Sequence, residues 1–339
     1  MRAVIVAAVL ALVAGCGKPT ATTAGPAGTN AIVTKGDMVL IPAGPFAMGN
    51  CMKPVKPSIL DRVKAFVKRQ PKPDLLDNNP AELPVHTVMV SAFYMDKHEV
   101  TTETWDEVYN WATNSGYEFD DPCESKAPDH PVRTVSWYGC VKWCNARSEK
   151  EGLTPCYYAD AARTGVYRVG QVALANECVN WAANGYRLPT EAEWEKAARG
   201  GWAGRRFPWG DTISHEQANY HSDYSIRYDR SWTRGGHPKC ATGGTPCTSP
   251  VGSFDPNGYG LYDMAGNVGE WCWDRYDRAY YAHSPGSDPH GPASGAARVV
   301  RGGSWNSLAY NSRSSNRFYY YPDNRSNYIG FRVVWAPRP

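Results

Sequence analysis

The chain has 339 residues, which is long enough for one large domain with appended segments and a sizeable core. Its 36 basic and 33 acidic residues nearly cancel, and the basic residues are mostly scattered, which argues against a nucleic-acid partner. The 32 glycines, 26 prolines, 13 tryptophans and 21 tyrosines predict a loop-rich fold stabilised by aromatic packing.

Residues 1–16 have the pattern of a lipoprotein signal. Arg2 supplies a positive charge, an apolar run follows, and the sequence VAGC ending at Cys16 resembles a bacterial lipobox. The apolar run is too short for a typical spanning helix. Lipidation of Cys16 would tether an exported protein to a membrane, and the glycine after it favours the outer membrane. Residues 17–35 then predict a flexible tether. The alternative is an ordinary cleaved signal with an incidental cysteine.

Nine further cysteines leave an odd number for pairing, so at least one is free or pairs between chains. Cys240 and Cys247 flank a loop with glycine and proline, which predicts a local disulfide. Cys140 and Cys144 lie one helical turn apart, so each is expected to meet a distant partner. Zinc binding is the alternative, but no CxxC pair is present.

Two strands are predicted near the start of the domain. MVLIPAGPF at 38–46 alternates into a turn, as an edge strand would, and HTVMVSAFYMD at 86–96 alternates as well. An insertion at 51–83 separates them. Within it, residues 58–70 have an apolar face and a basic face, the pattern of a helix that docks on its own domain or touches lipid headgroups.

Three helices are predicted after these strands. The first begins near Thr101, and the second begins at Ser136 and stops at Gly152. The third follows a capping box formed by Thr190 and Glu193, and its glutamates are expected to cap the helix or face solvent. After residue 200 no long amphipathic pattern returns, which predicts irregular chain with short strands.

The stretch NGYGLYDMAGNVGEW at 257–271 places hard oxygen ligands among four glycines. Glycine lets the backbone bend where a side chain would forbid it. Asp263 and Glu270 lie seven residues apart in such a loop, which makes a calcium cage plausible. The alternative is a tight turn that packs the aromatic residues of the stretch.

This stretch resembles the signature of the formylglycine-generating enzyme family, the sulfatase-modifying factor domain. Further blocks follow in the family's order: MVLIPAGPFAMGN at 38–50, FYMDKHEVT at 93–101, PVRTVSWYGCVKWCN at 131–145, NGYRLPTEAEWEKAARGG at 184–201, FPWG at 207–210, RGGSW at 301–305 and IGFRVV at 329–334. The resemblance implies one domain over residues 36–339, with an irregular, C-type-lectin-like α+β fold of low regular secondary structure.

The resemblance also implies structural calcium. The matching ligands of one site are the side chains of Asp263 and Glu270 and the carbonyls of Met264, Gly266 and Val268. The family's second site begins at Asn219 with the carbonyl of Tyr220. Its downstream carboxylate falls where this chain has Gly243, and Asp223 is the available substitute.

The family enzyme is understood to bind Cu(I) through two cysteine thiolates and to oxidise a sulfatase cysteine to formylglycine with O₂. The matching positions here are Ser307 and Ser312, and a neutral hydroxyl is a poor ligand for a soft Cu(I) ion. Ser304 matches a pocket serine of the family, and Gly269 stands where the family usually has tryptophan. Copper binding is therefore not expected.

Two functions follow as alternatives. The first is a calcium-stabilised outer-membrane lipoprotein that binds a peptide or protein ligand in the family groove without copper oxidase activity. The second is an oxidoreductase of the same superfamily, with residual formylglycine-generating activity or a non-haem iron site. The eight histidines have no HxH, HxxH or HxxxH spacing, so a facial triad would have to assemble in space.

Four arginines are expected near the groove. They either hold an anionic ligand or pair with neighbouring carboxylates. They are Arg301, Arg313, Arg317 and Arg325.

Overall fold

The computed structural model describes residues 32–52, 79–120, 123–241, 244–245 and 247–336. The predicted signal, Cys16, all but the end of the tether at 17–35, and the basic helix at 58–70 lie outside these residues. No helix of the described chain is long and apolar enough to cross a membrane.

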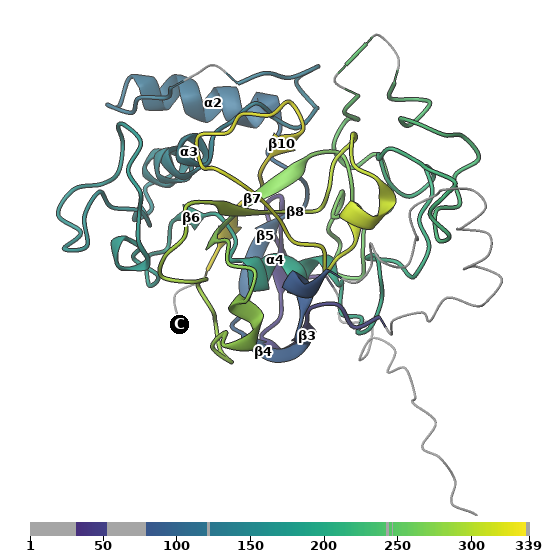
Figure 1. The fold of residues 1–339 in the computed structure, drawn as a ribbon. Helices are drawn as coiled ribbons and strands as arrows, with labels where there is room; N and C mark the ends of the chain where they lie inside the picture. The colour runs from purple at the N-terminus through teal and green to yellow at the C-terminus, as the bar shows by residue number, and fades with distance from the viewer. Residues whose placement is uncertain (1–31, 53–78, 121–122, 242–243, 246, 337–339) are drawn as a thin grey trace, which may run out of the picture.

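A five-stranded antiparallel sheet joins the two ends of the domain (Figure 1). Its strands, in spatial order, are β1 (Thr34–Lys35), β2 (Met38–Ile41), β5 (Phe93–Asp96), β11 (Val334–Trp335) and β6 (Tyr186–Arg187). The edge strand predicted at 38–46 is two strands. β2 is not an edge strand, because β1 pairs along its outer side, whereas β3 (Gly44–Met48) belongs to a separate two-stranded sheet.

The strand predicted at 86–96 is two strands in different sheets. β4 (His86–Val90) pairs with β3 (Gly44–Met48), whereas β5 pairs with β2. The chain turns between them at Ser91, whose backbone N–H and hydroxyl both donate to the Asp288 carboxylate at 2.7 Å. Alternation in sequence predicted the extended chain but not this break.

A four-stranded sheet carries the C-terminal part of the fold. Its order is β10 (Ile329–Gly330), β7 (Gly269–Arg275), β8 (Arg298–Arg301) and β9 (Phe318–Tyr320). β10 runs parallel to β7, and the other pairs are antiparallel. β7 is the longest strand of the described residues, in agreement with the prediction of short strands.

The three predicted helices are confirmed. They are α2 (Thr102–Thr113), α3 (Trp137–Lys150) and α4 (Glu191–Ala198), and their N-caps are Thr101, Ser136 and Thr190. The Thr190–Glu193 capping box is complete. Short 3₁₀ helices are η2 (Pro80–Glu82), η3 (Asn176–Cys178), η4 (Tyr280–Ala282) and η5 (Ala309–Ser312).

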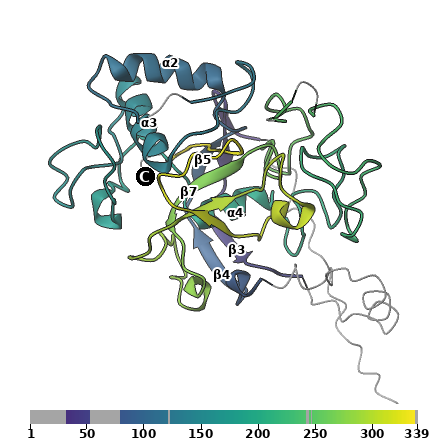
Figure 2. The same ribbon diagram turned by 45° about the horizontal axis from the view of Figure 1, so that its top comes forward.

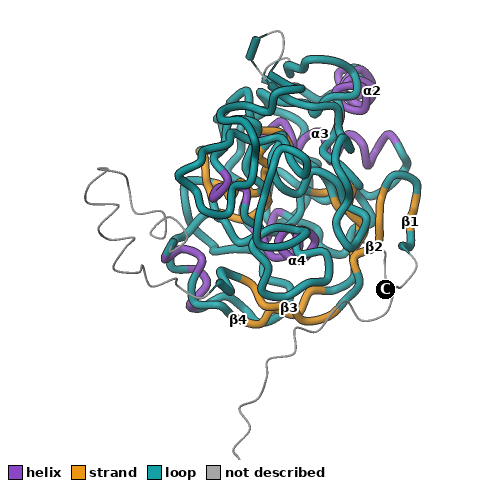
Figure 3. Tube along the Cα trace, turned by 90° about the vertical axis from the view of Figure 1, so that its right-hand side faces the viewer, coloured by secondary structure: helices purple, strands orange, loops and turns teal. Residues whose placement is uncertain are grey.

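Loops make up most of the fold, as Figure 3 shows. The described residues between α4 and β7 contain no helix or strand. Buried aromatic rings fill the space that regular elements leave: Trp105 stacks on Trp143 with ring centroids 6.0 Å apart, and both rings contact Phe331 edge-on. The composition therefore predicted the packing correctly.

Helix α4 lies in the middle of the molecule in both ribbon views (Figures 1 and 2). Glu193 caps the helix as predicted, but none of the three glutamates faces solvent, because each is buried against an arginine. Glu191 accepts two hydrogen bonds from Arg317 at 2.7 and 2.8 Å, and Glu195 accepts one from Arg301 at 2.6 Å. A buried carboxylate is tolerated only with such a partner.

Replacing Arg317 by methionine should strip the Glu191 carboxylate of its bidentate partner. We expect the free energy of unfolding to fall by about 3–5 kcal/mol, the range for breaking one side of a buried ion pair. Denaturant unfolding followed by tryptophan fluorescence measures this change. The control is Lys150→Met, which removes the partner of the exposed Glu107 carboxylate and should cost about 1 kcal/mol or less. Equal losses of unfolding free energy in the two variants would contradict the stabilising role of the buried arginine–glutamate pairs on α4.

Candidate functional site

A pocket lies on one face of the four-stranded sheet. All four strands contribute to its lining, with Gly269 opposite Ile329 and Val300 opposite Phe318 in the strand register. The cavity measures about 180 Å³. The lining residues are Gly269, Val300, Gly303, Ser304, Asn306, Ser307, Asn311, Asn316, Phe318, Tyr320, Tyr328 and Ile329.

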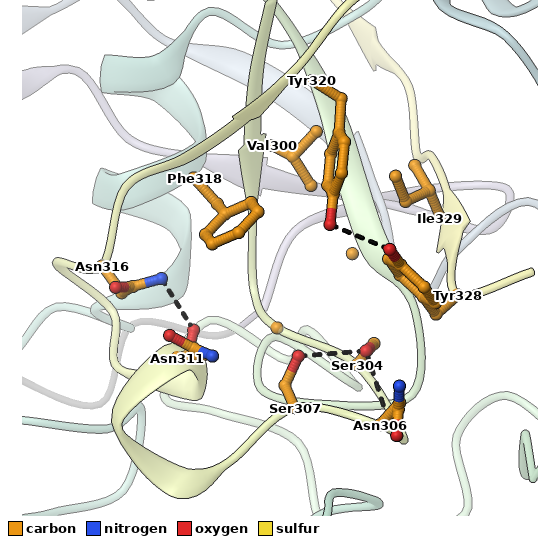
Figure 4. Close-up of a pocket in the computed structure, with 12 residues that line it drawn as sticks. Val300, Ser304, Asn306, Ser307, Asn311, Asn316, Phe318, Tyr320, Tyr328 and Ile329 are labelled. Carbon is orange, nitrogen blue, oxygen red and sulfur yellow. Dashed lines mark hydrogen bonds between the residues drawn. The ribbon is translucent and has the colours of Figure 1, made fainter. Parts of the chain in front are cut away.

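Hydroxyl and amide groups supply the polar surface of this pocket, as Figure 4 shows. The hydroxyl oxygens of Ser304 and Ser307 lie 3.0 Å apart, and those of Tyr320 and Tyr328 also lie 3.0 Å apart. Burial and the hydrogen bond with Tyr328 raise the pKa of Tyr320, so its phenol stays protonated at neutral pH. No carboxylate, imidazole, amine or thiol of the described residues lines the pocket.

Ser312 does not share the pocket with Ser307. Its hydroxyl is fully buried and has no hydrogen-bond partner among the described residues. The oxygen lies 2.6 Å from the position that a Cβ on Gly303 would occupy, and Gly303 has a φ of +73°. Glycine is therefore needed at 303, both for this close approach and for its left-handed backbone.

Gly269 forms part of the pocket floor. A Cβ at this position would lie 2.9 Å from Cγ1 of Val300, so any larger residue requires Val300 to move. Glycine at the position where the family usually has tryptophan keeps this floor open.

Three of the four candidate arginines belong to the framework beneath the pocket. Arg301 and Arg317 bind the α4 glutamates, and Arg313 donates two hydrogen bonds to Glu82 at 2.7 and 2.8 Å. These three arginines therefore pair with neighbouring carboxylates, the second of the two roles predicted for them, and are not free to hold an anionic ligand. Arg325 is exposed and does not line the pocket.

A second cluster surrounds Asp263, beside the pocket strands in sequence. One oxygen of Asp263 accepts a hydrogen bond from the Gly252 N–H at 2.7 Å, and its Oδ1 is buried without a partner in the part of the chain that the structure describes. Burial raises the pKa of Asp263 to about 6. Burial and the charge of Asp263 raise the pKa of Glu99 well above its ordinary value. Such a pair of buried carboxylates suits a divalent cation.

Glu270 already has protein partners. Arg332 donates to both of its oxygens at 2.7 Å, and Trp194 Nε1 donates at 2.7 Å. The sequence predicts Glu270 as a calcium ligand and gives no role to Glu99, which is fully buried and accepts hydrogen bonds from Asn267 and Val268. Glu99 lies within the block FYMDKHEVT, but nothing in that block indicates its distant partners.

Met264, Gly266 and Val268 lie in the same buried stretch as Asp263. No group of three or more histidine, cysteine, aspartate or glutamate side chains in the described chain is arranged to hold a metal ion. An ion beside Asp263 would therefore depend on backbone carbonyls as well as carboxylates. The unpartnered Oδ1 of Asp263 and the excess of buried carboxylates fit a calcium ion beside Asp263, at one end of the predicted ligand set.

The second predicted calcium site has fewer available donors. Asn219 Oδ1 is buried without a partner in the described residues, but the Tyr220 carbonyl accepts a hydrogen bond from His215 at 3.1 Å. The Asp223 carboxylate accepts one from the Ser225 N–H at 2.8 Å. Gly243 lies outside the described residues.

The predicted disulfide between Cys240 and Cys247 is absent from the structure, in which all nine described cysteines are free thiols. Cys240 and Cys247 are both buried, and the sulfur of Cys247 contacts the Gly244 carbonyl instead. Cys140 and Cys144 are buried in the main core.

Two histidines come close together without forming a metal site. The rings of His215 and His237 have centroids 5.0 Å apart. Their ring nitrogens bond to protein groups: His215 to Thr233 and to the Tyr220 carbonyl, and His237 to the His215 carbonyl and the Lys239 N–H. Within the described residues, these two histidines therefore do not form part of a triad of metal ligands.

Sequence comparison identifies the class to which this fold and pocket belong. A family model described as "Sulfatase-modifying factor enzyme 1-like domain" matches residues 23–337. The formylglycine-generating enzyme of Streptomyces coelicolor is 36% identical over 312 residues, which cover 87% of this chain and 88% of that protein. The "Chaperone protein LppX" of Paenibacillus barcinonensis is 32% identical over 228 residues, which cover 64% of this chain and 71% of that protein.

Solved structures agree with the sequence matches. Treponema denticola variable protein 1 superposes with a TM-score of 0.58 and 29% identity, covering 88% of this chain and 95% of that chain. PvdO from Pseudomonas aeruginosa gives a TM-score of 0.58 and 26% identity, covering 88% and 94%. The chain belongs to the sulfatase-modifying factor (formylglycine-generating enzyme) family, and the predicted fold class is confirmed.

Calcium should stabilise the chain most strongly above pH 6. Without metal, the raised pKa values of Asp263 and Glu99 favour their protonated forms in the folded state. Their stabilising contribution is thus complete below about pH 4 and is lost as the pH rises through about 6. We expect Ca²⁺ to raise the melting temperature clearly at pH 7.5 and only slightly at pH 5.

Thermal melts of the full chain with Ca²⁺ or with EDTA measure this effect. Asp263→Asn should abolish the response to calcium, whereas Asp255→Asn, at an exposed carboxylate in the preceding loop, should leave it intact. A wild-type melt at pH 7.5 that responds to neither Ca²⁺ nor EDTA would show that no calcium binds.

Proposed function

We propose that this chain is an exported, lipid-tethered binding module of the sulfatase-modifying factor family that has lost copper oxidase activity. The observation that carries the proposal is the pair of serines at the copper-thiolate positions. Ser307 hydrogen-bonds to Ser304 in the pocket, and Ser312 is buried behind Gly303. Neither hydroxyl is a ligand that a soft Cu(I) ion prefers.

The chemistry of the pocket also favours binding over catalysis. A serine nucleophile needs a general base within hydrogen-bond reach. Ser304 and Ser307 bond to each other, and no imidazole or carboxylate of the described residues lines their pocket. The remaining polar groups are amides and phenols, which recognise a ligand without changing it.

A protein or peptide is the ligand class that we propose for this pocket. The relative from Paenibacillus barcinonensis is named a chaperone protein, and a chaperone acts on other proteins. The pocket offers donors and acceptors from Asn306, Asn311 and Asn316 beside the ring of Phe318. This combination of ring surface and neutral hydrogen-bonding groups suits an uncharged segment of a polypeptide.

The proposed calcium ion has a structural role. It would lie beside Asp263 and Glu99, and Arg332 holds Glu270 next to them. The same loop leads into β7, which supplies the pocket floor at Gly269. An ion here would offset the repulsion between buried carboxylates and fix the loop beneath the pocket.

The wild-type chain should bind no Cu(I) and convert no cysteine in a sulfatase-type CxPxR peptide. The double variant Ser307→Cys/Ser312→Cys should gain tight Cu(I) binding provided that the side chain at 312 turns past Gly303 to meet the one at 307, because two thiolates hold this ion and two hydroxyls do not. Competition with a chromophoric Cu(I) chelator measures binding, and mass spectrometry of the peptide detects the aldehyde.

The two single cysteine variants are the matched controls, and each should bind Cu(I) far more weakly than the double variant. Aldehyde formed by the wild type in the presence of Cu(I) and O₂ would overturn the proposal. It would mean that another group of the chain supports the oxidation.

The tether is tested separately. Cys16→Ser removes the thiol that lipidation would modify, so we expect the variant to leave the membrane fraction or to accumulate unprocessed. Fractionation of cells that express the full chain, followed by immunoblotting, measures the distribution. Sedimentation of the variant with membranes to the same extent as the wild type would exclude a lipid anchor at Cys16.

A further inference from the structure

Residues 222–239 form a loop that exposes large aromatic side chains. We call it the 222–239 loop. Trp232 is 89% exposed and Tyr224 is 51% exposed. Hydrogen bonds within the loop nevertheless fix its conformation. Ser222 and Gly235 exchange backbone hydrogen bonds at 2.8 and 3.0 Å, and the Tyr224 hydroxyl donates to the Trp232 carbonyl at 2.7 Å. Exposed aromatic rings on an ordered loop indicate a contact surface.

Basic side chains surround these rings. Arg234 lies over the Tyr224 ring, 4.7 Å from its centroid. The exposed basic residues of the loop are Arg227, Arg230, Arg234 and Lys239. Its acids are less available, because Asp229 is buried against the Tyr220 hydroxyl and Asp223 is half-buried. Outside the loop, Glu216 adds an exposed carboxylate to the neighbouring surface, and Asp255 is exposed in the segment that contains Phe254.

A hollow of about 570 Å³ lies beside the loop. Trp232 and Pro238 of the loop line it together with Phe254 from another segment. The rings of His237 and Phe254 meet edge-on at 5.5 Å within its wall. The exposed tryptophan therefore stands at the rim of a larger, partly apolar face.

The tether enters the domain beside Gly260, in the segment that continues from Phe254 of the hollow. Ile32, the first described residue, contacts Gly260, where an added Cβ would lie 3.0 Å from Ile32 Cδ1. Gly260 follows Phe254 in the segment that borders the hollow. The chain between Cys16 and Ile32 spans at most about 55 Å when fully extended. A lipid at Cys16 would hold the 222–239 loop within reach of the bilayer.

We propose that the 222–239 loop docks on the anionic phospholipid surface of the membrane that holds the tether. Tryptophan and tyrosine settle at the level of the lipid headgroups. Arginine and lysine are attracted to anionic lipids, and the attraction weakens in high salt. The docking goes beyond the proposed ligand pocket, which uses other residues, and it depends on the tether only for proximity.

The test compares the full-length wild type with the variant Trp232→Ala/Arg234→Gln/Lys239→Gln. Both are mixed with vesicles of phosphatidylcholine, with and without phosphatidylglycerol. Each basic side chain contributes about a fivefold gain in affinity for an anionic surface. We expect the triple change to weaken flotation with anionic vesicles by about tenfold or more, with little change on neutral vesicles.

Hydrogen exchange locates the contact. Amides of residues 222–239 in the wild type should exchange more slowly on anionic vesicles, and high salt should remove this protection. The control variant Tyr321→Ala/Arg325→Gln/Arg278→Gln removes one exposed aromatic and two exposed basic side chains elsewhere. It should bind like the wild type, and all three proteins should have equal melting temperatures.

Equal flotation of the wild type and the loop variant would overturn the proposal, as would unchanged exchange of the loop on anionic vesicles. The face would then belong to a protein partner. Wild type and variants share residues 1–31, so their difference reports the loop even if Cys16 carries no lipid. Failure of the copper prediction would leave this result unaffected.

Discussion

Helix α4 carries three buried glutamates, and an arginine from another segment holds each one. Arg317 binds Glu191, Arg187 binds Glu193, and Glu195 receives both Arg301 and Arg199. Burial alone would raise the pKa of Glu195, but Arg199 and Arg301 hold it below its ordinary value. Charges this deep are stable only while every partner is present. The loops around α4 are therefore fixed by one interdependent network.

This network also forms the frame of the pocket. Arg301 donates to the carbonyls of Ser314, Ser315 and Asn316, and Arg317 donates to the carbonyl of Ala81. The side chains that face the pocket bond to one another instead, as the Ser304–Ser307 pair does. The frame does not need the lining groups. A family member can thus exchange thiolates for hydroxyls and keep the fold.

Local signals in the sequence predicted much of this fold. The caps at Thr101, Ser136 and Thr190 depend on neighbours within one turn, and all three helices begin there. The break at Ser91 depends on Asp288, which lies far away in sequence, so alternation at 86–96 suggested one strand. The burial of the α4 glutamates could not be predicted for the same reason. A buried and a solvated glutamate look alike in sequence until the distant arginine that pairs with the buried one is known.

The site was predictable in position but not in detail. Ser304, which matches a pocket serine of the family, does line the pocket, but its neutral lining did not follow, because arginines were expected near the groove and none of them lines it. The roles of Ser307 and Ser312 did not follow, since only the fold shows that the second serine is buried behind Gly303. Glu99 was missed because its partners, Asn267 and Val268, lie in another part of the chain.

Charge balance connects the acidic cluster to the compartment in which the chain is proposed to work. Among the described residues, the Arg332 guanidinium binds Glu270 and also acts on the charges of Glu99 and Asp263, so full ionisation of the three carboxylates leaves an excess of negative charge in a buried space. Protons relieve this excess at low pH, and a divalent cation relieves it at neutral pH without neutralising the carboxylates. With calcium bound as we propose, the cluster would link the stability of the pocket floor to the ions available. A chain exported from the cell would meet those ions directly, with Asp263 Oδ1 the buried oxygen that still lacks a partner in the described residues.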